Sequence, residues 1–128
     1  RAEFLTNYAF YRYLYPSTQN LKYSVKTGSK KRRMQTKRII LTDGELNAAL
    51  SELDGWHVDG KCLRRRWTFE NFAASLDFVN QVGILAEEAD HHPDITFGWG
   101  YAELLLTTHD RGGITDVDIA LAAKIGRV

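Results

Sequence analysis

The sequence predicts an α+β protein, with a four-stranded antiparallel sheet and three helices packed on one face in the order α-β-β-α-β-β-α. Three stretches carry apolar residues at helical spacing. The segments between them are short, bounded by glycine and rich in residues that suit a pleated sheet. One of them contains Asp59-Gly60, a preferred tight turn between strands. Short hairpins that alternate with helices are typical of α+β sandwiches.

Length and composition favour one soluble globular domain. The chain has 128 residues, of which 44% are hydrophobic and 26% are charged. No apolar run approaches the ~20 residues that a membrane-spanning helix needs, so a membrane protein is not expected. A single cysteine, Cys62, excludes an internal disulfide and a thiolate zinc site and suits a reducing compartment. We therefore expect a cytoplasmic protein.

The formal net charge of +1 hides two differently composed pieces. Residues 1–33 carry eight lysines and arginines against one acid, a balance of +7, and hold seven of the fifteen aromatic residues. The remainder carries nine basic and fifteen acidic residues, a balance of −6. We expect a single domain at residues 34–128, preceded by a basic, tyrosine-rich extension of unknown role. A targeting segment for an organelle, an upstream-frame artefact and an arm that binds nucleic acid or a partner all stay open, and the nucleic-acid interpretation rests on charge alone.

The first helix and the first hairpin follow directly from local signals. Thr42 and Glu45 have the spacing of a capping box, apolar residues continue at helical spacing, and Gly55 is expected to end the helix. Residues 56–58 and 61–69 then predict two strands joined at Asp59-Gly60.

The long helix is predicted at residues 71–90, with Pro93 ending it. Strands follow at residues 94–99 and 101–108, and the last helix begins after Thr115. Both of these helices carry apolar residues over more than one sheet-facing stripe. A domain this small has limited means of burying both sides, so a homodimer or homotetramer is expected.

Three histidines, His91, His92 and His109, stand at the ends of predicted elements, where a scaffold can aim polar groups into one cleft. Glu87 lies four residues before His91 and is expected to orient its imidazole; Glu88 has the same relation to His92. An imidazole held by a carboxylate suits general acid–base catalysis. A solvated ion pair on a helix is the structural alternative.

A metal site is the rival chemistry. Adjacent histidines on a helix point ~100° apart, which makes His91 and His92 poor joint ligands. Neither an HExxH motif nor a pair of cysteines is present. We therefore expect no metal.

The three histidines belong to a long spaced pattern. It comprises Glu87-Glu88-Ala89-Asp90-His91-His92-Pro93-Asp94, Trp99, Thr107-Thr108-His109-Asp110, Gly113-Ile114-Thr115 and Asp118, with Gly55-Trp56 and Trp67-Thr68-Phe69-Glu70-Asn71-Phe72 upstream. This pattern resembles the signature of the pterin-4a-carbinolamine dehydratases, over about residues 42–125.

The resemblance implies a homodimer or homotetramer of the same α+β architecture, with no metal or organic cofactor. It implies dehydration of 4a-hydroxytetrahydrobiopterin to the quinonoid dihydrobiopterin, which recycles tetrahydrobiopterin. It also implies site residues. His91, His92, His109 and Glu87 match catalytic positions, and Asp118, Trp56, Thr108 and Pro93 match substrate-binding positions.

Two interpretations remain beside the enzyme. Asp118 also has capping-box spacing from Thr115, so it has a structural as well as a catalytic interpretation. Animal members of the family bind a homeodomain transcription factor, so a non-catalytic dimerisation module of the same fold is the alternative function. An intact set of three histidines favours the enzyme.

Overall fold

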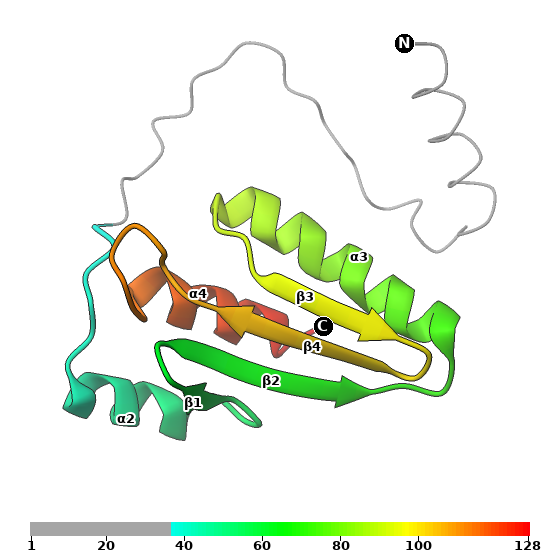
Figure 1. Ribbon diagram of the computed structural model, residues 1–128, viewed down its shortest axis with the longest axis horizontal. Coiled ribbons are helices and arrows are strands. Elements are labelled where there is room, and N and C mark those ends of the chain that lie inside the picture. Colours follow the sequence, from blue (N-terminus) through cyan, green and yellow to red (C-terminus); the bar gives the residue numbers. More distant parts are fainter. Residues whose placement is uncertain (1–36) are drawn as a thin grey trace, which may run out of the picture. The chain divides into compact units, whose positions relative to one another are not determined.

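The computed structural model describes residues 37–128, so the interpretations of residues 1–33 lie outside the described residues. Its helices and strands follow in the predicted order (Figure 1). They are α2 (Asp43–Ser51), β1 (His57–Asp59), β2 (Cys62–Thr68), α3 (Phe72–Ala89), β3 (Asp94–Gly98), β4 (Tyr101–Leu106) and α4 (Asp116–Ile125).

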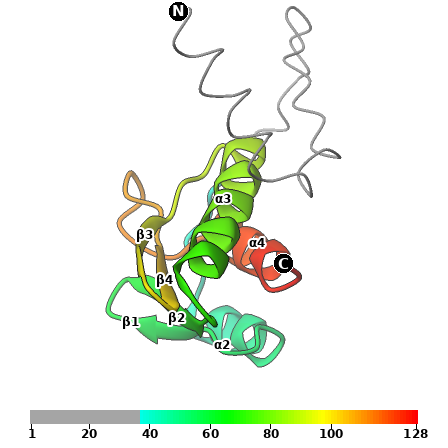
Figure 2. The same cartoon turned by 90° about the vertical axis from the view of Figure 1, so that its right-hand side faces the viewer.

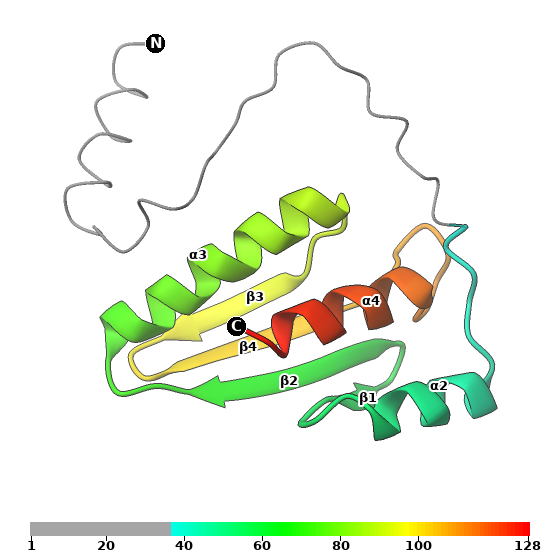
Figure 3. The same ribbon diagram turned by 180° about the vertical axis from the view of Figure 1, so that it is seen from behind.

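The four strands form one antiparallel sheet in the order β1-β2-β4-β3. Figure 2 shows the sheet edge-on, with α2, α3 and α4 all on the same side of it, and Figure 3 shows α3 and α4 lying across the sheet from that side. The predicted α+β fold with helices on one face is therefore confirmed.

The core lies between this face and the helices, because the side chains of a strand alternate between the two faces. Ala102, Leu104 and Leu106 of β4 are fully buried, whereas the residues between them are half-buried. In β2, Leu63 is fully buried on the same face.

The buried residues of α3 recur every three or four positions, as one packed helical face requires. They are Ser75, Phe78, Val82 and Ala86. This helix contacts β3, β4 and α4. Among the described residues no helix is long and apolar enough to cross a membrane.

Several predicted boundaries differ from the structure, including that of the strand predicted at residues 101–108, which ends at Leu106. The first helix ends at Ser51 instead of Gly55, because Glu52 and Leu53 bond to carbonyls three residues back and tighten the chain into turns. Gly55 has a φ of +76°, and there the chain reverses to bury Trp56. The hairpin turn lies at residues 60–61, one position later than predicted, since Asp59 still pairs with Cys62.

Candidate active site

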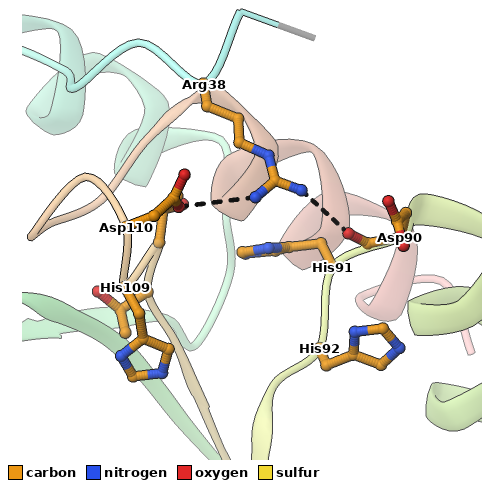
Figure 4. A pocket seen from close by; sticks show the side chains of 8 residues that line it. Arg38, Asp90, His91, His92, His109 and Asp110 are labelled. Carbon is orange, nitrogen blue, oxygen red and sulfur yellow. Dashed lines mark hydrogen bonds and ion pairs between the residues drawn. The ribbon is translucent and has the colours of Figure 1, made fainter. Parts of the chain in front are cut away.

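A cavity of about 340 Å³ lies at the end of the sheet where β4 finishes and β3 begins. Because neighbouring strands run antiparallel, the residues before β3 and those after β4 meet at this edge. Figure 4 shows the three predicted histidines around it, His91 and His92 on one wall and His109 on the other. The lining residues are Arg38, Asp90, His91, His92, Thr107, Thr108, His109 and Asp110.

The first wall is shaped by the way α3 ends. Asp90 adopts a left-handed conformation, with φ at +50°, and caps the helix. The backbone N–H of His91 then donates to the carbonyl of Ala86 at 3.1 Å. This turn sends His91 into the protein, where it is 6% exposed, while the side chain of His92 stays 58% exposed. The two adjacent imidazoles therefore occupy different environments.

His91 is held by the carboxylate of Asp118. Its Nε2 lies 2.5 Å from Asp118 Oδ1, and both side chains are buried. The second carboxylate oxygen accepts a hydrogen bond from the hydroxyl of Thr108 and another from the backbone N–H of Thr115, each at 2.8 Å. Asp118 therefore caps α4 and orients His91 at the same time, which combines its two predicted interpretations.

The hydroxyl of Thr108 supports this arrangement. Since its one hydrogen is donated to Asp118, the hydroxyl of Thr115, 2.8 Å away, must donate to Thr108. All three side chains are 1% exposed or less. The carboxylate is thus fixed by donors on two sides.

Glu87 does not orient His91 as predicted. Its Oε1 lies 2.6 Å from Nε2 of His92, and both side chains are more than half exposed. The helix ends at Ala89, so the spacing of four residues to His91 no longer places the two side chains on one face. The predicted pairing of Glu88 with His92 is also wrong, because His92 pairs with Glu87.

His109 lies on a tight loop after β4. The backbone of Thr108 pairs with Gly113, and Gly112 turns the chain with a φ of +74° while its N–H donates to the Thr108 carbonyl. This geometry leaves His109 and Asp110 exposed at the mouth of the cavity.

Four predicted site residues lie outside the lining: Glu87 and Asp118, which contact histidines of the lining, and Trp56 and Pro93. Trp56 is 6% exposed in the core, where its ring meets Trp67 edge-on with centroids 5.5 Å apart. Pro93 follows His92 on the way into β3. Neither of them lines this cavity, whereas Thr108 does.

Arg38 lines the cavity and was not predicted. Its guanidinium reaches the Asp90 carbonyl at 3.2 Å and Asp110 Oδ1 at 3.6 Å (Figure 4). Its own φ of +43° and its position before the first helix carry no spacing signal that sequence reasoning could have used.

The lining presents one buried imidazole with a fixed orientation and two exposed imidazoles, and an imidazole can serve as a general acid or a general base. Side chains of this kind can support proton transfer. In the part of the chain that the structure describes, no three His, Cys, Asp or Glu side chains are grouped as metal ligands.

Fold and site together define a small α+β protein with a pocket lined by three histidines. The chain belongs to the pterin 4 alpha carbinolamine dehydratase family, whose model matches residues 40–128.

Relatives agree with this assignment. A protein of Rubrobacter xylanophilus that is provisionally named pterin-4-alpha-carbinolamine dehydratase is 52% identical over 85 residues, 66% of this chain and 79% of that protein. A protein of Paracoccus denitrificans with the same provisional name is 41% identical over 101 residues, 77% of this chain and 94% of that protein.

Two solved structures are similar. The crystal structure of a transcriptional coactivator/pterin dehydratase from Brucella melitensis has a TM-score of 0.66 and 36% identity, covering 70% of this chain and 97% of that one. A pterin dehydratase-like protein, described as a RuBisCO assembly factor in the alpha-carboxysome, has a TM-score of 0.50 and 28% identity, covering 57% and 87%.

Proposed function

We propose that this protein dehydrates 4a-hydroxytetrahydrobiopterin to the quinonoid dihydrobiopterin and water by histidine general acid–base catalysis, in tetrahydrobiopterin recycling. The observation that carries the proposal is the convergence of His91, His92 and His109 on one cavity from two separate loops. Membership of the family supports the substrate class.

The reaction needs two proton transfers. The bond from ring carbon 4a to its hydroxyl oxygen breaks, and an acid must protonate that oxygen so that it leaves as water. A base removes the proton from the neighbouring ring N–H, and the electrons of that bond form the new C=N double bond. Electrons and atoms balance without an oxidant, a reductant or a cofactor.

We assign the base to His91 and the acid to His109. In the neutral ring, Nε2–H of His91 donates a hydrogen bond to Asp118, which leaves Nδ1 as the acceptor. Nδ1 makes no hydrogen bond within the described residues, and His91 lines the cavity. His109, on the opposite wall, is exposed and free to take up a proton from water.

The remaining site residues have positioning roles in this proposal. Asp118 orients His91, and Glu87 orients His92. Thr108 supports Asp118 from within the lining. We restrict direct substrate contacts to the cavity lining, so Trp56 and Pro93 act through the fold instead of touching the pterin.

A dehydration assay on enzymatically generated 4a-hydroxytetrahydropterin tests the proposal. We expect His91→Ala and His109→Ala each to lower kcat by about 10²–10⁴-fold, the usual contribution of a general acid or base. His57→Ala is the matched control, because His57 is an exposed histidine on β1 outside the cavity lining. Wild-type protein that performs no better than buffer, or variants that both keep full activity, would contradict the proposal.

A non-catalytic interaction module is the second candidate. It is favoured by the two solved neighbours, one described as a transcriptional coactivator/pterin dehydratase and the other as a pterin dehydratase-like assembly factor. Under this alternative the wild-type protein is inactive and its partner binding is unaffected by the histidine substitutions. A homodimer or homotetramer belongs to either proposal, since α3 leaves apolar side chains such as Phe72, 47% exposed, on its surface.

A further inference from the structure

The segment that carries Arg38 is fastened to the start of α4. The Leu41 N–H donates to the Ile114 carbonyl at 3.2 Å, and the Asp116 N–H donates to the Ile39 carbonyl at 3.3 Å. The Ile39 N–H in turn donates to the carboxylate of Asp116 at 3.0 Å. These bonds involve the residues directly after Arg38, and they fix the position of its backbone next to the start of α4.

From this anchor the side chain of Arg38 crosses the mouth of the cavity. One terminal nitrogen donates to the Asp90 carbonyl at 3.2 Å, and the other forms an ion pair with Asp110 at 3.6 Å. Figure 4 shows the guanidinium between these two partners, which belong to opposite walls. Asp90 directly precedes His91, and Asp110 directly follows His109. Arg38 therefore connects the backbone of one histidine wall to the loop of the other.

The backbone of Arg38 is left-handed, which is unusual for a residue other than glycine. A non-glycine residue at a φ of +43° is strained by contact between its Cβ and the following carbonyl oxygen. Such a conformation persists only where the surrounding contacts determine it. Here those contacts are the pairing with α4 and the two bonds across the cavity. These contacts hold the side chain of Arg38, which is 31% exposed, at the mouth of the cavity.

We propose that Arg38 is a positioning residue that sets the spacing between His109 and His91 by tying the two walls together. This inference rests on the proposed function. Arg38 precedes residue 40, where the match to the family model begins. Because proton transfer is sensitive to displacements of about 1 Å, a loosened His109 loop slows the chemical step more than it weakens substrate binding.

The kinetic test compares three variants with a matched control. Arg38→Ala is expected to lower kcat by about tenfold while KM changes less than about twofold. Asp110→Asn removes the same ion pair from the other side and is expected to lower kcat in the same direction. Arg38→Lys restores only part of the activity, because an ammonium lacks the fork that reaches two partners. Arg111→Ala is the control: Arg111 also lies near Asp110, at 3.8 Å, but does not line the cavity, so kcat is expected to stay at the wild-type value.

A second readout does not depend on catalysis. The amides of Arg111 and Gly112 donate to the Thr108 carbonyl and close the His109 loop. We expect their hydrogen exchange to be about threefold faster or more in Arg38→Ala than in the wild type, since local opening determines exchange.

The outcomes separate the two proposals. Wild-type protein without dehydratase activity overturns the proposed function, and hydrogen exchange then decides the positioning role alone. Unchanged exchange in Arg38→Ala overturns that role. A higher KM with unchanged kcat also overturns it, because it assigns Arg38 to substrate contact. If Arg38→Ala does not fold, as judged by circular dichroism, Arg38→Lys and Asp110→Asn decide by the same criteria.

Discussion

Asp118 connects stability and chemistry in one side chain. It is 0% exposed, and its two oxygens serve His91, Thr108 and the backbone of Thr115. A buried carboxylate is costly unless donors surround it, and here three donors do so. Its negative charge also selects the His91 tautomer that carries its proton on Nε2.

Replacing Asp118 by asparagine is expected to reverse that tautomer. The amide must keep its oxygen toward Thr108 and the Thr115 N–H, so its NH₂ group faces His91 and donates to Nε2. The proton of the neutral imidazole then moves to Nδ1, which can no longer act as a base. We expect Asp118→Asn to lower kcat by about 10²–10⁴-fold, as for other histidines held in the wrong tautomer.

Nitrogen-15 spectra of the imidazole check the cause. In Asp118→Asn these spectra should show the imidazole proton on Nδ1 instead of Nε2. Circular dichroism should show that the variant keeps its fold. Thr42→Ala, which removes a helix cap at a distance from the cavity, is a suitable control for stability loss alone. Wild-type kcat in Asp118→Asn would contradict the positioning role of this carboxylate.

The sequence identifies the residues of the candidate site but not which of them bond to one another. The three histidines could be named because they stand at element ends within a long motif. The partner of His91 could not be read from spacing, because Asp118 lies 27 residues away and meets it only in the folded chain. Glu87 was paired wrongly because the left-handed Asp90 breaks the helical geometry that the spacing assumes.

Among the helices, α2 begins with a complete capping box. Glu45 N–H donates to the Thr42 hydroxyl at 3.3 Å, and Thr42 N–H donates to Glu45 Oε2 at 2.9 Å. The hydrogen bond from the Thr42 backbone, followed by that from its hydroxyl, holds the pKa of Glu45 below its ordinary value of 4.5. The negative charge is also favourable near a helix N-terminus.

The lowered pKa predicts how stability depends on pH. The unfolded chain lacks these bonds, so its Glu45 binds a proton at higher pH than the folded chain does. The stabilisation is therefore present above the unfolded-state pKa and is lost as the pH falls through the folded-state pKa. Glu45→Gln is expected to lower the free energy of unfolding at about pH 7, and the gap to wild type should be smaller at about pH 3, below the ordinary pKa of glutamate. Urea unfolding at both pH values measures it.

Glu52→Gln is the matched control. Glu52 stands at the other end of α2, where a negative charge is unfavourable, and its side chain makes no hydrogen bond among the described residues. This substitution should not lower stability at about pH 7. A gap for Glu45→Gln that is the same at both pH values would contradict the capping argument.

Element starts could be predicted here better than element ends. The capping box at Thr42 and the long helix at residues 71–90 were read from local spacing, and the structure confirms both. The end of α2 depends on how the chain folds back to bury Leu53 and Trp56, which local spacing does not contain. The sheet order β1-β2-β4-β3 likewise depends on pairing between strands that are distant in the sequence.

For the molecule as a whole, the sheet has two unlike faces. One face is covered by helices and carries the fully buried core, and the other carries charged side chains such as Arg64, Arg66 and Glu103. Arg66 lies over the ring of Tyr101 there, 4.2 Å from its centroid. The fold class could be predicted because helical periodicity and short hairpins are properties of separate segments, whereas the cavity exists only where β3 and β4 meet.

Adjacent leucines of β4 test this two-faced architecture. Leu104 is 0% exposed and points toward α3 and α4, whereas Leu105 is half-buried on the opposite face. Leu104→Ala removes core volume and is expected to lower the free energy of unfolding by about 2–5 kcal/mol, because a cavity remains. Leu105→Ala makes the same chemical change in the same strand and is expected to cost under about 1 kcal/mol, since little apolar surface is withdrawn from water there. Equilibrium unfolding in urea measures both, and equal losses would show that the second face is buried as deeply as the first.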